Sequence, residues 1–325
     1  MRESAKLHAE LRGAMDRRTF LTTAAALAPS LRGIAHGPWP PASHSNTRLI
    51  LLGTAGGPRP RTTRSSSAQV IVANESAYVI DCGNGVARQL VAAGVPLRSI
   101  RNVFVTHHHS DHNADYGTLL LLAWTAGLAA PVDTWGPPPL KRITEAFFDM
   151  SATDIDARMR DEGRPDLRPL VRAHELRAGG RVVEDANLKV TAAVVDHPPL
   201  APAFAYRFDA PDRSIVISGD TRRSEALVAL ARGADVLVHE ALIAEAVDRL
   251  VANVPNASDL KRSILSHHTT AEDAGRVAEA AGVGTLVLSH LVPAEDPTVS
   301  EATWVEAARR HFRGRVILGR DLLEI

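Results

Sequence analysis

The segment FVTHHHSDHNAD, residues 104–115, places four histidines and two aspartates within twelve residues. It begins as an apolar strand-like run, and on extended backbone the side chains two positions apart point to the same side. His107 and His109 can therefore face one metal ion. Asp111 and His112 fall where the chain turns into a helix, and such a turn can direct both toward a second ion. The H-x-H-x-D-H pattern thus predicts ligands for two metal ions.

Three more residues of ligand type stand at the ends of apolar, strand-like runs. His197 ends VTAAVVDH, Asp220 ends SIVISGD and His290 ends TLVLSH. Ligands at strand ends can meet at one edge of a sheet, so these three are expected to converge with the HxHxDH segment. Five histidines and two aspartates suffice for two metals that share a bridging carboxylate. Nitrogen and oxygen ligands without thiolate favour zinc, with manganese or iron as alternatives.

The composition narrows the class of protein. Cys82 is the one cysteine of the 325 residues, so neither an internal disulfide nor a zinc site of the cysteine type can form. Lys and Arg together equal Asp and Glu together, 37 each, which argues against nucleic acid as the main partner without excluding it. With 45% hydrophobic residues, the chain can bury a sizeable core.

The order of strand-like and helical segments predicts the fold. Strand-like runs cover 48–57, 68–85, 100–107, 188–197, 202–209, 214–220, 284–291 and 314–325. Helical patterns cover 85–95, 113–128, 270–283 and 300–312. Each half of the chain begins with strands in hairpins and continues with strands that alternate with helices. This order predicts an α/β fold, a four-layer αβ/βα sandwich, with a charged helical insertion at 136–172.

The N-terminal segment has the pattern of a targeting signal. MDRRTFLTTAAALAPSL begins at Met15 and puts Arg17 and Arg18 before a short apolar run, as in a twin-arginine export signal. The run is too short to span a bilayer. We therefore expect a signal at 1–35, a linker at 36–46, a catalytic domain at 47–325, and a periplasmic or extracellular location.

The motifs THHHSDH, VIDCGNG, ISGD, LVHEA and LSH, in this order, resemble the metallo-β-lactamase superfamily. Within it they are most similar to the branch that holds ribonuclease Z and the arylsulfatase-like hydrolases. The resemblance implies a first metal bound by His107, His109 and His197, a second bound by Asp111, His112 and His290, Asp220 as the bridge, and Asp81 as the carboxylate that orients the ligand loop.

Two further segments are similar to the ribonuclease Z branch. SHHTTAEDAG resembles its H-x-T segment and LVHEA its His-Glu-Ala segment. The resemblance implies that His268 lies over the site with Glu240 as its partner, where the pair can protonate a leaving group or hold a developing oxyanion. It also implies a homodimer.

The expected reaction is ester hydrolysis by a hydroxide that bridges the two metals. The segment between His112 and His197 carries a charged insertion but no Gly/Lys-rich arm of the kind that ribonuclease Z uses to hold tRNA. That difference and the export signal favour an arylsulfatase-like hydrolase of small esters. The alternatives are a ribonuclease Z-like tRNA 3′-end endonuclease, a lactone hydrolase and a metal-binding protein without catalysis.

Overall fold

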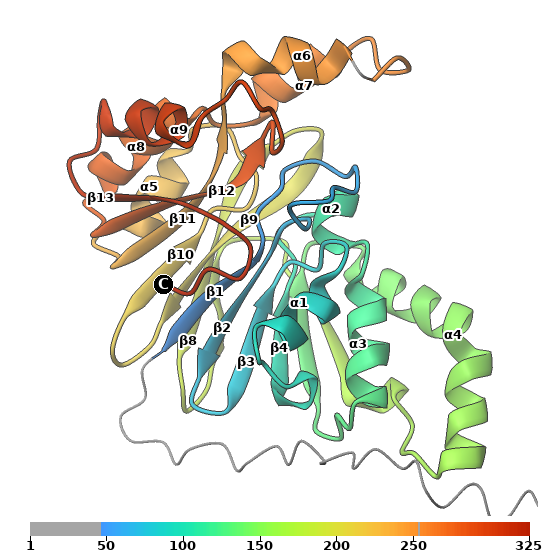
Figure 1. Cartoon of the computed structure of the whole chain (residues 1–325). Helices are drawn as coiled ribbons and strands as arrows, with labels where there is room; N and C mark the ends of the chain where they lie inside the picture. Colours follow the sequence, from blue (N-terminus) through green and yellow to red (C-terminus); the bar gives the residue numbers. More distant parts are fainter. Residues whose placement is uncertain (1–46, 253) are drawn as a thin grey trace, which may run out of the picture. The chain divides into compact units, whose positions relative to one another are not determined.

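Two mixed β-sheets form the centre of the fold (Figure 1). The first sheet follows chain order: β1 (Arg48–Gly53), β2 (Ala68–Ala73), β3 (Ser76–Ile80), β4 (Ile100–Phe104), β5 (Val132–Gly136) and β6 (Val171–Glu175). Its first three strands pair antiparallel, and β3 to β6 pair parallel. This computed structural model describes residues 47–252 and 254–325. The predicted signal at 1–35 and linker at 36–46 lie outside the described residues.

The second sheet repeats the same progression from antiparallel to parallel pairing. Its strands are β7 (Gly180–Glu184), β8 (Lys189–His197), β9 (Leu200–Asp209), β10 (Ser214–Ile217), β11 (Val236–Leu242), β12 (Thr285–Val292) and β13 (Arg315–Leu318). The spatial order is β13-β12-β11-β10-β9-β8-β7, in which β7 to β10 pair antiparallel and β10 to β13 parallel.

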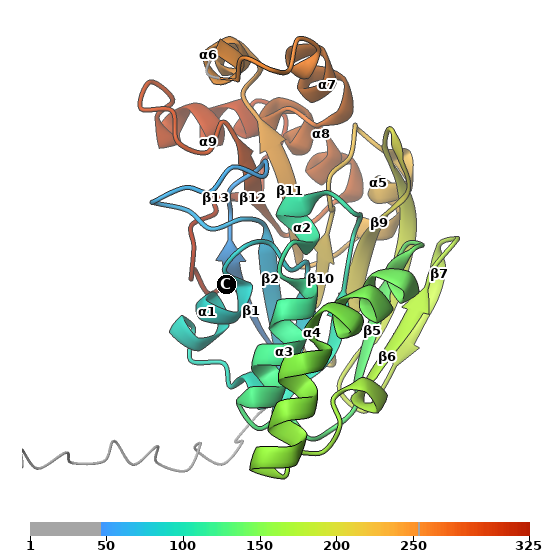
Figure 2. The ribbon, with the colours of Figure 1, turned by 90° about the vertical axis from the view of Figure 1, so that its right-hand side faces the viewer.

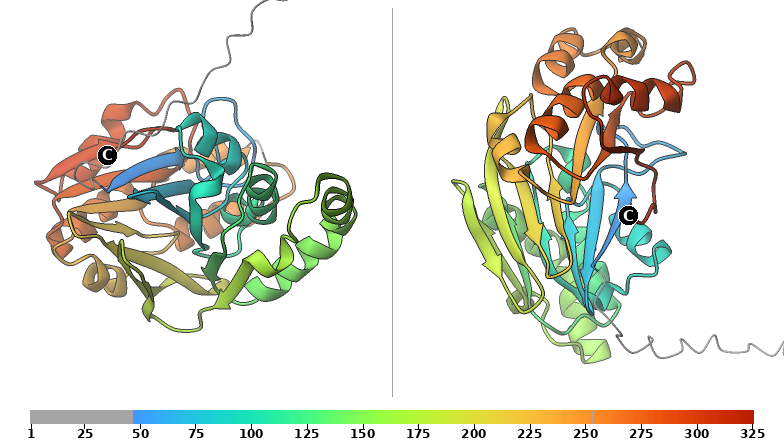
Figure 3. Two further views of the ribbon diagram at one scale, coloured as in Figure 1. Left: turned by 90° about the horizontal axis from the view of Figure 1, so that it is seen from below. Right: turned by 90° about the vertical axis from the view of Figure 1, so that its left-hand side faces the viewer.

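Helices cover the outer face of each sheet, which confirms the predicted four-layer sandwich (Figure 3). The first sheet carries α1 (Val86–Ala92), α3 (Tyr116–Thr125) and α4 (Leu140–Glu162), and the second carries α5 (Glu225–Ala231), α8 (Ala271–Ala281) and α9 (Glu301–Arg309). The remaining helices are α2 (Ser110–Asn113), α6 (Val247–Ala252) and α7 (Leu260–His267), with 3₁₀ turns η1 (Leu97–Ser99), η2 (Arg168–Leu170) and η3 (Ala244–Ala246). Among the described residues, no helix has the length and apolar character that a membrane crossing requires.

Strand alternation explains why both faces of each sheet are covered. On β3, Val79 points to the core under α1 and α3, whereas Tyr78 and Ile80 point to the core between the sheets. The inner core is rich in aromatic rings, and Phe104 meets Tyr206 and Phe208 of the opposite sheet at centroid distances of 5.4 and 5.2 Å. These ring contacts pack the two sheets against each other.

The charged segment 136–172 contains α4, which runs beside α3 (Figure 2). Its solvent face carries i,i+4 ion pairs, since Arg158 lies 3.0 Å from Asp154 and 2.7 Å from Glu162. Its inner face places Ile155 in the core of the first sheet. Helices α6 and α7 lie together at the other end of the molecule (Figures 1 and 2).

Candidate dimetal site

Three histidines from two segments form the first group of ligand atoms. His107 and His109 follow β4, and His197 ends β8 in the other sheet. Nδ1 of His109 lies 3.0 Å from Nε2 of His107 and 3.1 Å from Nε2 of His197. With a carboxylate oxygen of Asp220, these nitrogens fall within 4.8 Å of one another, a spacing that one metal ion can fill.

A second group adjoins the first. Asp111 and His112 lie in the short helix α2, and His290 lies in β12. Nε2 of His290 is 3.2 Å from Oδ2 of Asp111, and Nε2 of His112 is 3.7 Å from the same oxygen. These three and Asp220 again offer ligand atoms within 4.8 Å of one another.

Asp220 belongs to both groups, and one of its oxygens faces them. Its Oδ2 lies 3.3 Å from Nε2 of His112 and 3.2 Å from Nε2 of His290. The same oxygen lies 3.8 Å from Nε2 of His107. The preceding Gly219 has φ +59°, and a Cβ there would meet the Phe204 carbonyl oxygen at 2.7 Å. Glycine thus permits the tight turn that aims Asp220 inward.

Asp81 holds the ligand loop from behind. Its Oδ2 lies 2.7 Å from Nδ1 of His112, and its Oδ1 accepts the Thr106 backbone N–H at 2.8 Å. The Thr106 hydroxyl donates to Asp81 at 2.9 Å and lies 3.0 Å from Nδ1 of His107. Hydrogen bonds of this kind fix the orientation of an imidazole ligand. One buried carboxylate therefore orients a histidine of each group, directly or through Thr106.

Glu240 and His268 form a buried pair beside the second group. Nδ1 of His268 lies 2.8 Å from Oε2 of Glu240, and Oε1 of Glu240 accepts the Thr221 backbone N–H at 2.6 Å. Burial disfavours the imidazolium, but the Glu240 charge and hydrogen bond outweigh it and raise the pKa of His268 to about 9. Burial also raises the pKa of Glu240. We assign the shared proton to His268, because the Glu240 charge holds the pKa of this imidazole above its usual value.

The charge states around the site suit a cation. Burial lowers the pKa of His107 well below its usual value and that of His197 to about 4, so both imidazoles are neutral, as metal ligands must be. Burial opposes the charged form of Asp111, yet His112 and His290 outweigh it and lower its pKa. Burial would also lower the pKa of His112, but Asp220, Asp81 and Asp111 raise it instead. A metal bound there would replace that proton.

One buried atom at the centre also fits metal binding. Nε2 of His112 has no hydrogen-bond partner among the described residues. Buried polar atoms are nearly always paired, so such an atom calls for a ligand, an ion or water. For His112 the adjacent carboxylates of Asp111 and Asp220 point to a metal ion. The residues present therefore fit the dimetal site that this donor set predicts.

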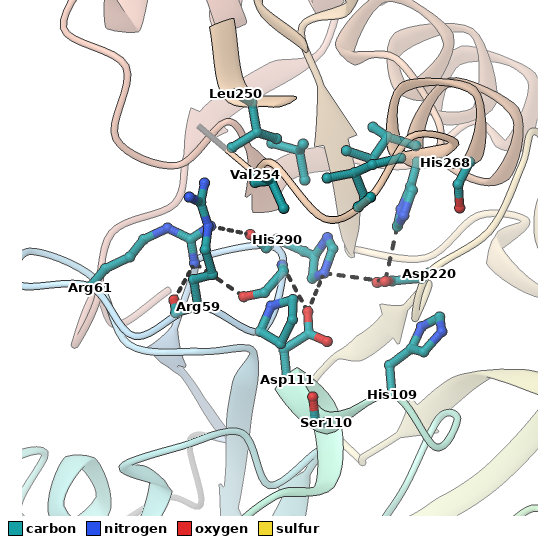
Figure 4. A pocket seen from close by; sticks show the side chains of 18 residues that line it. Arg59, Arg61, His109, Ser110, Asp111, Asp220, Leu250, Val254, His268 and His290 are labelled. Carbon is teal, nitrogen blue, oxygen red and sulfur yellow. Dashed lines mark hydrogen bonds and ion pairs between the residues drawn. The ribbon is translucent and has the colours of Figure 1, made fainter. Parts of the chain in front are cut away.

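A cleft of about 350 Å³ opens over the site (Figure 4). His109, Asp111 and Asp220 lie on one side of it, and Leu250 and Val254 from the α6–α7 region lie across from them. The apolar wall is completed by Ala257, Leu260, Ile264 and Val292, and the mouth by Arg59 and Arg61. The sequence patterns did not reveal this wall.

The loop after β1 also reaches the site. The backbone N–H of Gly57 donates to Oδ2 of Asp111 at 2.8 Å. The Arg61 guanidinium holds this loop by donating to the Gly56 carbonyl at 2.7 Å and to the Gly57 carbonyl at 3.1 Å. The GTAGGPRPR stretch has the pattern for this role, because successive glycines let backbone approach a ligand closely. Contact of this loop with the site was not predicted from the sequence.

Three histidines that adjoin the motif residues of the HxHxDH, HxT and LVHEA segments point elsewhere. Nε2 of His108 faces the Pro137 carbonyl oxygen at 2.8 Å. Nδ1 of His267 lies 3.2 Å from the Ser263 hydroxyl, and Nδ1 of His239 faces the Glu240 carbonyl at 2.8 Å. The expected alternation along the HHH run is thus what the structure shows.

Comparison with known proteins identifies the family. The sequence model of a family described as "Beta-lactamase superfamily domain" matches residues 77–291. Ribonuclease Z of Mycobacterium bovis (strain BCG / Pasteur 1173P2) is 34% identical over 277 residues, which cover 84% of this chain and 96% of that protein. The chain belongs to the metallo-β-lactamase superfamily. As the sequence predicted, this superfamily member is of the ribonuclease Z branch and is a metal-dependent hydrolase that acts on ester-type bonds.

Two further matches point the same way. Ribonuclease Z of Mycobacterium sp. (strain KMS) is 36% identical over 278 residues, 84% of this chain and 94% of that protein. The crystal structure of human tRNase Z, short form, superposes with a TM-score of 0.62 at 21% identity and covers 86% of this chain and 98% of that one. The structural match shows the shared fold, and the fold of this superfamily implies a dimetal site.

These relatives overturn the prediction of an arylsulfatase-like hydrolase of small esters. That prediction rested on the lack of a Gly/Lys-rich arm between His112 and His197 and on the predicted export signal. The match nevertheless covers 96% of the M. bovis ribonuclease Z. Lack of such an arm therefore does not separate this chain from proteins of that name, and the ribonuclease Z alternative is the better-supported one.

Proposed function

We propose that this superfamily member is a ribonuclease Z-type phosphodiesterase that hydrolyses RNA. The observation that carries the proposal is the match over nearly the whole length of mycobacterial ribonuclease Z, at 34–36% identity. The chain also keeps a full set of ligand-type side chains at the proposed centre. A binding protein without catalysis would not need the His268–Glu240 pair in addition.

The proposed ligand assignment follows the two groups. His107, His109 and His197 would hold one metal, and Asp111, His112 and His290 would hold the other. Asp220 would be shared by the two groups. This division is supported because Oδ2 of Asp220 faces histidines of both groups. Five imidazoles with two carboxylates favour zinc, with manganese and iron as alternatives.

When bound, the two divalent metals supply an activated water and neutralise charge on the phosphate. The chain provides the acid–base group. His268 lies at the rim of the centre, with its Nδ1 3.8 Å from Oδ2 of Asp220. The Glu240 carboxylate accepts from Nδ1, which leaves Nε2 as the atom that donates a proton to the departing oxygen of the substrate. Glu240 is a positioning residue in this scheme.

The cleft supports a substrate with an anionic backbone and an apolar face. Arg59 is exposed at its mouth and can meet a phosphate that flanks the scissile one. Leu250, Val254 and Ile264 offer an aliphatic surface on which a nucleobase can rest. A single-stranded RNA end combines these two features.

Cleavage of a precursor tRNA with a 3′ trailer tests this proposal. The full chain, loaded with zinc or manganese, is compared on this RNA and on p-nitrophenyl sulfate. We expect metal-dependent RNA cleavage at a rate that exceeds sulfate hydrolysis. Intact RNA in the presence of chain that carries two metals would contradict the proposal.

A further inference from the structure

A second, much smaller cavity lies behind the proposed metal ligands. It has a volume of about 10 Å³, and the residues that line it are all buried, among them Gln69, His112, Ile217, Asp220, Ser289 and His290. It reaches from β2 of the first sheet to β12 of the second. A volume of roughly 10–15 Å³ is the room that one water molecule requires.

Five residues that line this cavity each have one buried polar atom with no hydrogen-bond partner among the described residues. Nε2 of His112 faces Asp111 and Asp220 on the side proposed for the metal. The other four atoms are Oε1 of Gln69, Oδ1 of Asp220, Oγ of Ser289 and Nδ1 of His290. An unpaired buried polar atom costs about 1–3 kcal/mol. Four of them beside one cavity therefore point to a shared partner in that cavity.

The orientation of Asp220 shows which kind of partner its unpaired oxygen requires. Its Oδ2 faces the histidines of both groups, at 3.2 Å from His290 and 3.3 Å from His112. Its Oδ1 is turned away from these contacts and is buried. A carboxylate oxygen can only accept a hydrogen bond, so the partner of Oδ1 must be a donor.

His290 has the opposite requirement. Its Nε2 lies 3.2 Å from the oxygens of both Asp111 and Asp220, which is the side proposed to face the metal. A histidine that binds a metal through one nitrogen carries its proton on the other, so Nδ1 must donate. Oε2 of Glu240 lies 3.8 Å from Nδ1, beyond hydrogen-bond distance.

We propose that the cavity behind the metal ligands is a binding site for one structural water, which joins Gln69 and Ser289 to Asp220 and His290. The water donates its two hydrogens to Oδ1 of Asp220 and Oε1 of Gln69. It accepts from Nδ1 of His290 and from the Ser289 hydroxyl. Two donors and two acceptors are what a single water satisfies, and a polar cavity of this size holds it.

The site makes Gln69 and Ser289 positioning residues for the proposed second metal. Through the water they fix the ring of His290 and the plane of the Asp220 carboxylate. Outer partners of metal ligands typically change metal affinity by about 10- to 100-fold when they are lost. The inference rests on the proposed metal ligands but not on the identity of the substrate.

A crystal structure of the metal-loaded full chain, at a resolution that shows ordered water, gives the first test. We expect a density peak within hydrogen-bond distance of Oδ1 of Asp220 and Nδ1 of His290. Two metals with a dry cavity would overturn the water site while leaving the metal centre intact. No bound metal at all would overturn the proposed function instead.

Metal titration of two variants gives the second test, which needs no substrate. For Gln69→Leu and Ser289→Ala, zinc competition with a chromogenic chelator should show the weaker site losing about 10- to 100-fold in affinity. The tighter site should change less. Ile217→Val, which removes a methylene from the same cavity wall without touching a polar atom, is the matched control. Equal zinc affinities in all three variants and the wild type would contradict the proposal.

Discussion

Oδ2 of Asp220 lies 3.2 Å from Nε2 of His290. Asp220 follows β10 and His290 lies in β12, and β11 between them contributes Glu240. These three strands run parallel, so their carboxyl ends meet at one edge of the sheet. Parallel pairing thus brings together, from distant parts of the chain, the proposed bridging carboxylate, a proposed metal ligand and the proposed positioning carboxylate.

Replacement of Asp220 by Ala should remove the bridge. We expect turnover to fall by at least about three orders of magnitude, since the metals contribute several kcal/mol to charge stabilisation. The metal content should fall below two per chain. Elemental analysis and RNA cleavage on the same preparation measure both effects. A variant that retains activity would refute the assignment of Asp220.

Replacement of His268 by Ala should leave two metals bound but slow cleavage by roughly two to four orders of magnitude, the range of an acid–base group. Glu240→Gln should slow it less, because the imidazole remains and loses only its charged partner. His267→Ala is the matched control, since that neighbouring ring faces Ser263 instead of the cleft. If the metal content of the His268 variant collapses, His268 is a ligand and the scheme is wrong.

The pair Arg59 and Arg61 separates substrate binding from loop positioning. Arg61→Ala removes hydrogen bonds to three backbone carbonyls of the loop that holds Asp111, so unfolding by urea should show a loss of about 1–3 kcal/mol. Arg59→Ala should leave the stability unchanged and raise KM for RNA, with a weaker salt dependence. An Arg59 variant with unaltered KM would remove this residue from the proposed substrate contacts.

Removal of metal should lower the melting temperature. Zinc at a thousand times its Kd stabilises the folded chain by about 4 kcal/mol, which for a domain of this size is roughly 8 °C. Calorimetry before and after chelation, and again after zinc is restored, measures this. The Asp220→Ala chain should respond less than the wild type. A melting temperature that is the same in all three states would contradict a metal centre held by buried side chains.

Most of the proposed metal ligands could be predicted from local sequence patterns. His107 and His109 are related by strand periodicity, and His197, Asp220 and His290 end apolar runs, so their convergence follows from the fold. The four-layer architecture follows from the order of strand and helix patterns. Glu240 and His268 were found only through family resemblance, because no spacing links them.

Other parts could not be predicted because they depend on contacts between distant segments. The apolar wall of the cleft comes from Leu250 and Val254, whose segment has no motif. Gln69 and Ser289 are ordinary strand residues until the two sheets bring them to one cavity. The arylsulfatase-like prediction rested on the missing Gly/Lys-rich arm and on the export signal, and the match over 96% of a mycobacterial ribonuclease Z contradicts it.

The most direct test of a metal-activated water acting on an RNA phosphodiester is cleavage in heavy-oxygen water. Precursor tRNA is cut to completion by the zinc-loaded chain, and the terminal phosphate of the product is analysed by mass spectrometry. We predict that one solvent oxygen enters that phosphate and that chelation stops the reaction. A cyclic phosphate without solvent oxygen, or cleavage that survives full removal of metal, would contradict the account.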